Sequence, residues 1–168
     1  MTQELTIRRV TSSPEDIETL VQLRHAMQTE LDPGEGGRAG IGPSELIEAT
    51  RAYFTKQLSG YHFSAFFVQY GAEVVATGGL VVYDNPPGPS NPSGTEGYIM
   101  NMYTVPAWRG HGLAKLILDR LVEHARAEGA GRVWLRASDQ GRAVYERFGF
   151  HQRDSYMQMF IWKQEKAE

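Results

Sequence analysis

The chain of 168 residues has a formal net charge of −3, and 41% of its residues are hydrophobic, an ordinary globular mixture. Its mildly acidic balance argues against a broad nucleic-acid or membrane-surface footprint. The lack of cysteine excludes disulfides, thiolate metal sites and a cysteine nucleophile, and the five scattered histidines have no helical pair spacing that would favour a metal site.

Length and hydropathy also set expectations for domain organisation and location. No apolar run approaches the roughly 18–20 residues that span a bilayer, and residues 1–10 lack the apolar segment of a secretory signal. We therefore expect a cytoplasmic protein with one domain over residues 1–168, of which residues 163–168 form a frayed tail.

The first half of the chain is predicted to form a strand, two helices and a β-hairpin. The expected ranges are a strand at 5–10, helices at 12–31 and 44–58, and hairpin strands at 61–70 and 73–84. The first helix has Pro14 in its first turn, followed by two acidic residues that favour the positive end of the helix dipole. A glycine-rich loop at 32–43 separates the two helices.

The second half alternates strands and helices after a proline-rich loop at 85–94. The expected ranges are strands at 95–105, 132–137 and 156–162, a long amphipathic helix ending before Gly129, and a short helix at 141–148. Loops as long as 32–43 and 85–94 are often functional in a compact domain, so we expect them to lie over one site.

A glycine-rich turn stands immediately before the long helix. Arg109, Gly110 and Gly112 lie where a helix N-terminus leaves backbone N–H groups unpaired, and glycine lets an anion approach them closely. A P-loop needs Lys and Ser or Thr after its glycines, and a Rossmann fingerprint needs a third glycine where Lys115 stands. The residues alone leave two alternatives, a diphosphate site and a tight strand-to-helix turn.

The stretch VPAWRGHGLAKLIL resembles the acyl-CoA-binding motif of the GNAT superfamily of N-acyltransferases. That motif reads Arg or Gln, two residues, Gly, one residue, then Gly or Ala, and it is matched by Arg109, Gly110, His111, Gly112, Leu113 and Ala114. Downstream, the segment from Gly141 to Phe150, which ends in YERFGF, resembles the family's short helix with a tyrosine and a terminal Gly-Phe. The order of elements covers nearly the whole chain.

The resemblance implies an α/β (α+β) GNAT fold. This is a mixed, mostly antiparallel twisted sheet of about six to seven strands flanked by about four helices, with acyl-CoA bound where central strands splay apart. It implies that backbone groups near Met102, Tyr103 and Val105 hold the pantetheine, and that N–H groups from Arg109 to Ala114 hold the pyrophosphate. The implied co-substrate is acetyl-CoA, with no metal.

The resemblance also implies direct acyl transfer to an amine. A backbone N–H near Met102 and Tyr103 would stabilise the oxyanion, and Tyr145 matches the family's thiolate-protonating tyrosine by position. Many relatives carry asparagine seven residues earlier, where this chain has Ser138, which can still hydrogen-bond the cofactor. Glu96 is a candidate base acting through water, and by strand alternation it shares a face with Tyr98, Met100 and Met102.

Three residues are candidates for binding the acceptor. Asn101 is polar in an otherwise apolar strand, Tyr98 lies on the same strand, and Glu30 stands near the glycine-rich loop, where it can receive a cationic amine. Each also has a purely structural reading, as a core amide, a packed ring or a loop charge.

The leading hypothesis is an N-acetyltransferase that acts on a small-molecule primary amine, without nucleic-acid or membrane partners. The alternatives are a protein N-terminal or lysine acetyltransferase, a non-catalytic acyl-CoA-binding or sensing module and, more remotely, an NAD(P)-binding protein. Dimers are common among such relatives, so a homodimer is a further expectation. Acceptor walls come from variable loops, and the sequence therefore names no acceptor.

Overall fold

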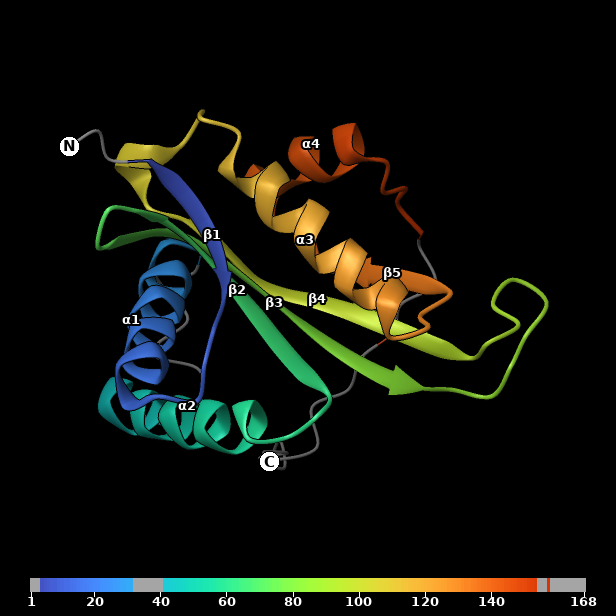
Figure 1. The fold of residues 1–168 in the computed structure, drawn as a ribbon, viewed down its shortest axis with the longest axis horizontal. Coiled ribbons are helices and arrows are strands. Elements are labelled where there is room, and N and C mark those ends of the chain that lie inside the picture. Colours follow the sequence, from blue (N-terminus) through green and yellow to red (C-terminus); the bar gives the residue numbers. More distant parts are fainter. Residues whose placement is uncertain (1–3, 32–40, 154–156, 158–168) are drawn as a thin grey trace, which may run out of the picture.

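The computed structural model describes residues 4–31, 41–153 and 157. In this part of the chain, five strands form one sheet in the order β1-β2-β3-β4-β5 (Figure 1). The strands are β1 (Leu5–Arg9), β2 (Phe63–Tyr70), β3 (Glu73–Asp84), β4 (Thr95–Thr104) and β5 (Arg132–Leu135). Neighbouring strands are antiparallel except β4 and β5, which are parallel, so the sheet is mixed.

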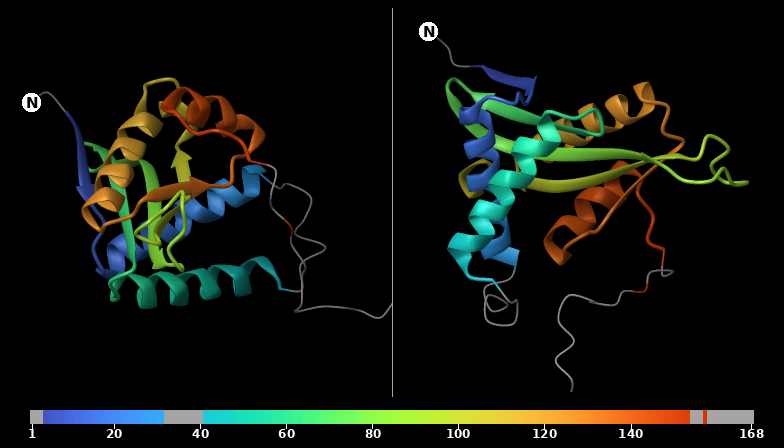
Figure 2. Two further views of the ribbon diagram at one scale, coloured as in Figure 1. Left: turned by 90° about the vertical axis from the view of Figure 1, so that its right-hand side faces the viewer. Right: turned by 90° about the horizontal axis from the view of Figure 1, so that it is seen from below.

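Helices cover both faces of the sheet. They are α1 (Pro14–Leu31), α2 (Pro43–Leu58), α3 (Leu113–Ala127) and α4 (Asp139–Phe148), with a short 3₁₀ helix, η2 (Pro106–Trp108), before α3. Figures 1 and 2 show α1 and α2 on one face and α3 on the other, with α4 beside α3. This two-sided arrangement leaves β4 between helices that come from both halves of the chain.

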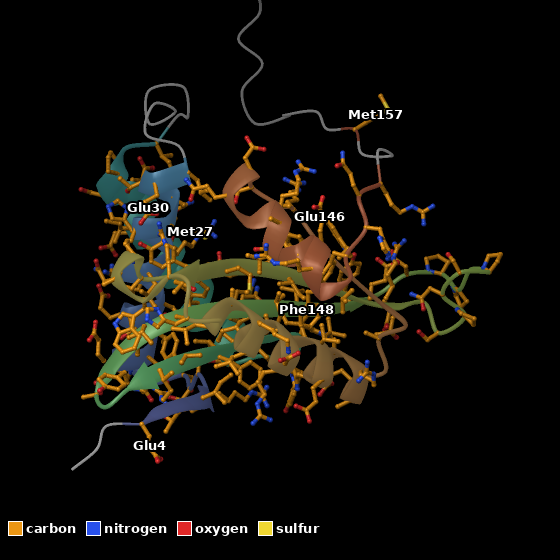
Figure 3. All side chains as sticks on the ribbon, turned by 90° about the horizontal axis from the view of Figure 1, so that it is seen from above. Glu4, Met27, Glu30, Glu146, Phe148 and Met157 are labelled. Carbon is orange, nitrogen blue, oxygen red and sulfur yellow. The ribbon has the colours of Figure 1, made fainter. Side chains whose placement is uncertain are left out.

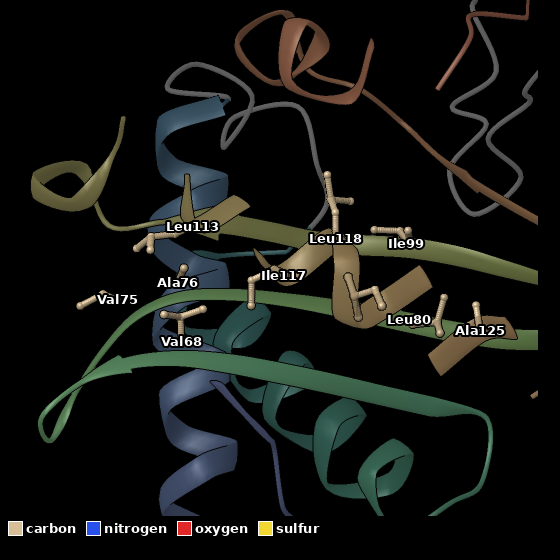
Figure 4. Packing of buried hydrophobic residues seen from close by; sticks show 10 residues of the cluster. Val68, Val75, Ala76, Leu80, Ile99, Leu113, Ile117, Leu118 and Ala125 are labelled. Atoms are coloured by element: carbon tan, nitrogen blue, oxygen red, sulfur yellow. The ribbon is translucent and has the colours of Figure 1, made fainter. Parts of the chain in front are cut away.

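Two hydrophobic cores fill the space between the sheet and its helices. Under α3, Ile117, Leu118 and Leu121 are fully buried against β3 and β4 (Figure 4). On the other face, Phe54 of α2 packs with Phe63 of β2. Both strands and helices follow the apolar periodicity of the sequence, because burying one face of each element is the main stabilising contribution to folding.

A β-bulge interrupts the pairing of β3 and β4. Thr77 lies opposite Tyr103 and Gly79 opposite Met100, so Asn101 and Met102 together face one β3 residue. Asn101 has a φ of 55°, in the left-handed region where asparagine is among the tolerated residues. The extra residue reverses the alternation of side chains beyond it.

The bulge corrects one expectation from strand alternation. Met100 packs with the core under α1 and α2, whereas Met102 packs with the core under α3. A Cβ on Gly78 would lie 2.6 Å from the Met102 sulfur, on the side that faces α3. Glu96, Tyr98 and Met100 therefore share one face, and the prediction that Met102 joins them is wrong.

The strands β4 and β5 separate after a short parallel ladder. Their pairing runs from Glu96 and Arg132 to Ile99 and Leu135, where β5 ends. The strand β4 continues to Thr104, and beyond Ile99 no described strand pairs with it on the β5 side. This is the divergence of neighbouring strands that the family resemblance implies.

The predicted order of strands and helices is confirmed within the described residues, with small shifts at the ends. The helix expected at 141–148 begins earlier, at Asp139, because the Ser138 side chain caps it. The sheet has five described strands rather than six to seven. The strand expected at 156–162 lies outside the described residues except for Met157, as do most of the loop at 32–43 and the tail at 163–168.

Candidate active site

A cavity of about 590 Å³ opens beside the second half of β4. This volume is in the range of small-molecule sites. Its walls come from the end of α1, the end of β4, the start of α3, and α4, and Figure 3 labels Met27 and Glu30 on α1 and Phe148 on α4. The lining residues are Met27, Glu30, Leu31, Met102, Tyr103, Thr104, Trp108, Arg109, Gly110, Gly112, Leu113, Ala114, Lys115, Ser138, Gln140, Gly141, Val144, Tyr145, Arg147 and Phe148.

The N-terminus of α3 opens into this cavity without a side-chain cap. Gly112 is the N-cap with a φ of 76°, and the first backbone bond of the helix runs from the Leu116 N–H to the Gly112 carbonyl. The N–H groups of Leu113 and Ala114 therefore have no backbone acceptor among the described residues. They point out at the positive end of the helix dipole, where an anion is stabilised.

Two glycines keep this helix end clear of side chains. Gly110 and Gly112 have φ values of 78° and 76°, which only glycine adopts without strain. A Cβ built on either would meet no heavy atom within 4 Å. The space above the backbone is therefore open, so an anionic group can approach the backbone N–H groups closely.

Arg109 is held at the cavity mouth by two partners. Its Nε donates to the Thr104 carbonyl at 3.1 Å, and its Nη2 donates to Glu30 at 2.5 Å. The Tyr103 hydroxyl donates to the other Glu30 oxygen, also at 2.5 Å. These hydrogen bonds, from Tyr103 first and then Arg109, hold the pKa of Glu30 below its ordinary value, so its carboxylate is ionised at neutral pH.

Two residues from the matched motif region lie outside the cavity lining. The Val105 N–H donates to the Val75 carbonyl at 2.9 Å, so the sheet already uses it. His111 is exposed, and its Nδ1 lies 2.9 Å from the Arg109 carbonyl oxygen. Met102 and Tyr103, by contrast, line the cavity along the part of β4 that β5 does not pair with.

Helix α4 forms the wall opposite β4 and carries Tyr145. Ser138 begins the helix by accepting the Gly141 N–H on its Oγ at 3.1 Å. The Tyr145 hydroxyl makes no hydrogen bond to any other described residue, and burial raises its pKa. A neutral hydroxyl with an unused proton, facing a cavity, is suited to donate that proton to an anion.

The close packing of Tyr145 depends on a glycine. A Cβ on Gly141 would lie 2.8 Å from Cε2 of the Tyr145 ring, so only glycine leaves room for the ring in its present position. Sequence reasoning did not single out Gly141 as a site residue. The spacing of Gly141, Val144, Tyr145 and Phe148 on one helix face is the signal that points to it.

Glu96 lies away from this cavity. It is 5% exposed, accepts a hydrogen bond from the Tyr83 hydroxyl at 3.0 Å, and pairs with Arg132 at 2.5 Å. This network joins β3, β4 and β5 where their pairing is intact. The structure therefore does not bring Glu96 and Tyr145 together, and a catalytic role for Glu96 stays a prediction.

Tyr98 and Asn101 are not in the cavity lining, although Asn101 directly precedes the lining residue Met102. The Tyr98 ring lies 4.3 Å from the Trp134 ring, centre to centre, and Asn101 accepts a hydrogen bond from Arg24 of α1. Neither Arg24 nor Trp134 was predicted as a site residue, because both meet β4 only through tertiary packing.

The described residues carry no sign of two other kinds of site. No group of three or more His, Cys, Asp and Glu side chains is placed to hold a metal ion in the described ranges. Across those same ranges, none of the helices has the length and apolar character needed to cross a membrane.

Two curated proteins resemble part of this chain. A [ribosomal protein bS18]-alanine N-acetyltransferase from Haemophilus influenzae is 33% identical over 61 residues, which cover 35% of this chain and 42% of that protein. A glucosamine 6-phosphate N-acetyltransferase from Trypanosoma brucei brucei is 32% identical over 63 residues, covering 38% and 43%. The matched segments thus span less than half the length of either relative.

Solved structures match the chain over nearly all of its length. A predicted acetyltransferase from Clostridium acetobutylicum, solved with acetyl-CoA, is 30% identical with a TM-score of 0.81, covering 94% of this chain and 96% of that one. A GCN5-related N-acetyltransferase from Ralstonia eutropha JMP134 has a TM-score of 0.80 at 23% identity, covering 94% and 99%, and shares the fold.

A family model supplies the assignment. The model of the acetyltransferase (GNAT) family matches residues 25–150, which include the glycine-rich turn, the splayed strands and the helix of Tyr145. The chain belongs to the GNAT family of acetyltransferases, in which acetyl-CoA is the co-substrate.

Proposed function

We propose that the protein transfers an acetyl group from acetyl-CoA to a primary amine of a small molecule by direct attack of the amine. The observation that carries the proposal is one cavity that joins an uncapped helix N-terminus, the part of β4 that β5 does not pair with, and the side chain of Tyr145. These are the features needed at the diphosphate, the pantetheine arm and the sulfur of the co-substrate.

Each wall of the cavity has its own part in the reaction. The amides from Gly110 to Ala114 bind the diphosphate, and the backbone at Met102 and Tyr103 binds the pantetheine arm and stabilises the oxyanion. The C–N bond forms first and gives a tetrahedral intermediate with an oxyanion, whose collapse restores the carbonyl and breaks the C–S bond, and Tyr145 gives its proton to the leaving thiolate. Ser138, at the cap of the same helix, is a further contact to the cofactor arm.

The amine must also lose a proton. Glu30 lines the cavity, but its pKa is lowered, so its carboxylate is suited to hold a cationic amine rather than to take its proton. We assign Glu30 to acceptor binding and keep Glu96 as the candidate base acting through water. If Glu96 takes part, Glu96→Gln is expected to lower the rate most at low pH, where little of the amine is unprotonated.

A protein acceptor is the second candidate, since one partial relative is named for acting on an alanine of a ribosomal protein. The other is named for an amino sugar phosphate, a small molecule. Thiol release measured with small amines and with peptides whose N-terminal residue is alanine separates the two. The cytoplasmic location and the homodimer stay predictions.

Tyr145→Phe tests the catalytic proposal. Removing the proton donor from the thiolate is expected to lower kcat about 100-fold or more, in the range of general acid catalysis. The affinity for coenzyme A, measured by calorimetry, is expected to stay within about threefold, because the ring that packs against Gly141 remains.

Tyr61→Phe is the matched control, since Tyr61 is 95% exposed and outside the cavity lining. Full activity in Tyr145→Phe contradicts the assignment. A wild-type protein that binds coenzyme A but releases no thiol with any amine or peptide supports a sensing module instead.

A further inference from the structure

Arg24 lies at the β-bulge, on the face of the sheet that α1 and α2 cover. It projects from α1, and its Nη1 donates to Oδ1 of Asn101, the residue with positive φ. One helical turn later on the same helix, Met27 lines the cavity. Asn101 directly precedes Met102, which lines the cavity from the strand. The Arg24 guanidinium is thus adjacent to the part of β4 where acetyl transfer is proposed.

This guanidinium has no anionic partner in the described part of the chain. Arg109 and Arg132 each pair with a glutamate, although their side chains are 44% and 49% exposed. Arg24 is more buried than either, and no described carboxylate lies within 4.0 Å of it. Burial lowers its pKa, and the nearby Tyr53 and Tyr98 only partly offset this effect. A half-buried cation without an anion is costly, so this position favours an anionic ligand.

Two aromatic side chains on the same face, Tyr53 and Tyr98, lie near enough to the guanidinium to act on its charge. Tyr98 stacks on Trp134 with an interplanar angle of 32°. Tyr53 of α2 is 37% exposed, and its hydroxyl lies 4.0 Å from the Met100 sulfur. A cation bordered by partly exposed rings binds an anionic group together with an apolar or planar skeleton.

The charge of Arg24 also discriminates among acceptors. A simple amine arrives as a cation and is repelled by an unpaired guanidinium at the transfer site. An acceptor that carries its own negative group reverses this effect and gains a charge-assisted hydrogen bond. We propose that the acceptor is an amine bearing a carboxylate or phosphate group, which Arg24 binds while Tyr53, Tyr98 and Trp134 flank the rest of the molecule. This assignment rests on the proposed acetyl transfer to small amines.

The test compares matched amines with and without the anion. The pairs are phenylalanine against phenylalanine amide, and glucosamine 6-phosphate against glucosamine, with thiol release as the readout. The wild-type protein is expected to prefer the anionic member of one pair by about 10- to 100-fold in kcat/KM, the value of a hydrogen bond between charged groups. A preference in the phenylalanine pair indicates that the site binds a carboxylate, and a preference in the glucosamine pair indicates that it binds a phosphate.

Arg24→Gln removes the charge and keeps a donor for Asn101. It is expected to reduce the preference to about threefold or less, whereas Arg24→Lys retains part of it. Because each amine has the same intrinsic reactivity in both proteins, the change in the ratio isolates Arg24. Arg120→Gln, an exposed arginine on α3, is the control and is expected to keep the wild-type preference. Calorimetric binding of the preferred amine to the protein with coenzyme A is expected to weaken by a similar factor in Arg24→Gln.

The outcomes separate this inference from the proposed function. Acetylation of amines with no preference for an anion, or a preference that survives in Arg24→Gln, overturns the role of Arg24 and leaves acetyl transfer intact. Binding of coenzyme A without thiol release from any amine overturns the proposed transfer, and the acceptor assignment with it. Where Arg24→Gln does not fold, Arg24→Lys takes its place, and a wild-type protein without a preference for the anionic amine still overturns the role of Arg24.

Discussion

At the scale of single residues, Gly141 controls where Tyr145 lies. In Gly141→Ala the new Cβ would stand 2.8 Å from the ring and 3.2 Å from the Ser138 hydroxyl, so the ring must move. We expect kcat to fall about 10-fold or more, since small displacements of a proton donor are costly. The thermal midpoint should not fall, because alanine favours a helix over glycine by about 1 kcal/mol.

Gly88→Ala is the control for this prediction. Gly88 lies in the loop between β3 and β4, away from the cavity lining, and a Cβ there meets no heavy atom within 4 Å. Steady-state kinetics and thermal unfolding of both variants are the measurements. Unchanged kcat in Gly141→Ala would mean that the ring position does not matter for turnover.

Residues in short motifs were predictable, whereas their distant partners were not. The structure places residues of the glycine-rich motif and of the helix that carries Tyr145 in the lining of one cavity. The pairing of Glu96 with Arg132 depends on the register of β4 against β5, across 36 positions of sequence. No local pattern encodes that register, so the sequence did not indicate that Glu96, the candidate base, pairs with an arginine. For the same reason, the contact between Arg24 and Asn101 had no sequence signal.

At the scale of elements, the N-terminus of α3 is where a substitution should separate binding from stability. Gly112 and Gly129 flank this helix with φ values of 76° and 83°, and a Cβ on either meets no heavy atom within 4 Å. Glutamate at either position should cost about 1–2 kcal/mol of stability from backbone strain. Only Gly112→Glu adds a negative charge and bulk at the diphosphate site.

We therefore expect Gly112→Glu to weaken coenzyme A binding at least about 100-fold, as like charges brought together cost several kcal/mol. Gly129→Glu should bind coenzyme A normally with a similar loss of thermal stability. Calorimetric titration gives the affinities and thermal unfolding the stabilities. Normal affinity in Gly112→Glu would refute the diphosphate assignment.

The bulge explains why the sequence did not predict which face of the sheet the side chains at the end of β4 occupy. The sequence from Tyr98 to Tyr103 is apolar on both faces except for Asn101, so alternation gives no sign of an inserted residue. The polar asparagine in the left-handed region marks the insertion only once the register is known. The order of elements along the chain and the hairpin of β2 and β3 followed from composition and turns, because hairpin strands are adjacent in sequence.

At the scale of the whole molecule, an ion pair joins the first strand to the first helix. Arg8 of β1 donates to both carboxylate oxygens of Asp16 in α1, at 2.8 and 2.7 Å. The Thr11 N–H adds a third bond at 2.7 Å. The Arg8 hydrogen bond is the main cause that lowers the pKa of Asp16 from its ordinary value of 3.8 to about 2.

Because the pKa of Asp16 is lower in the folded state than in the unfolded state, the ionised carboxylate stabilises the fold. This stabilisation is fully present at pH values above the unfolded-state pKa and is lost as the pH falls through the folded-state pKa. We expect Asp16 to contribute about 2 kcal/mol to the free energy of unfolding at pH 7, and the contribution to vanish between about pH 4 and pH 2. Asp16→Asn should therefore be less stable at pH 7, and the difference should shrink across that window. Urea unfolding at pH 7, 4 and 2.5 measures it.

Asp119→Asn is the comparison, because Asp119 forms an exposed pair with Lys115 four positions earlier on α3. That ion pair should contribute about 0.5 kcal/mol or less to the free energy of unfolding. A difference for Asp16→Asn that stays constant from pH 7 to pH 2.5 would contradict the assigned ionisation. The expectation of one domain over residues 1–168 stays a prediction.

The early end of β5 has a consequence for the durability of the protein. Because β5 stops at Leu135 while β4 runs on to Thr104, part of β4 has main-chain groups on that side that no described strand pairs with and that a bound guest molecule can complete. A guest at a hundred times its dissociation constant adds about 2.7 kcal/mol to the free energy of unfolding. Resistance to heat and to proteases should therefore rise and fall with the supply of coenzyme A, so the same strand would link a cell's metabolic state to the lifetime of the protein.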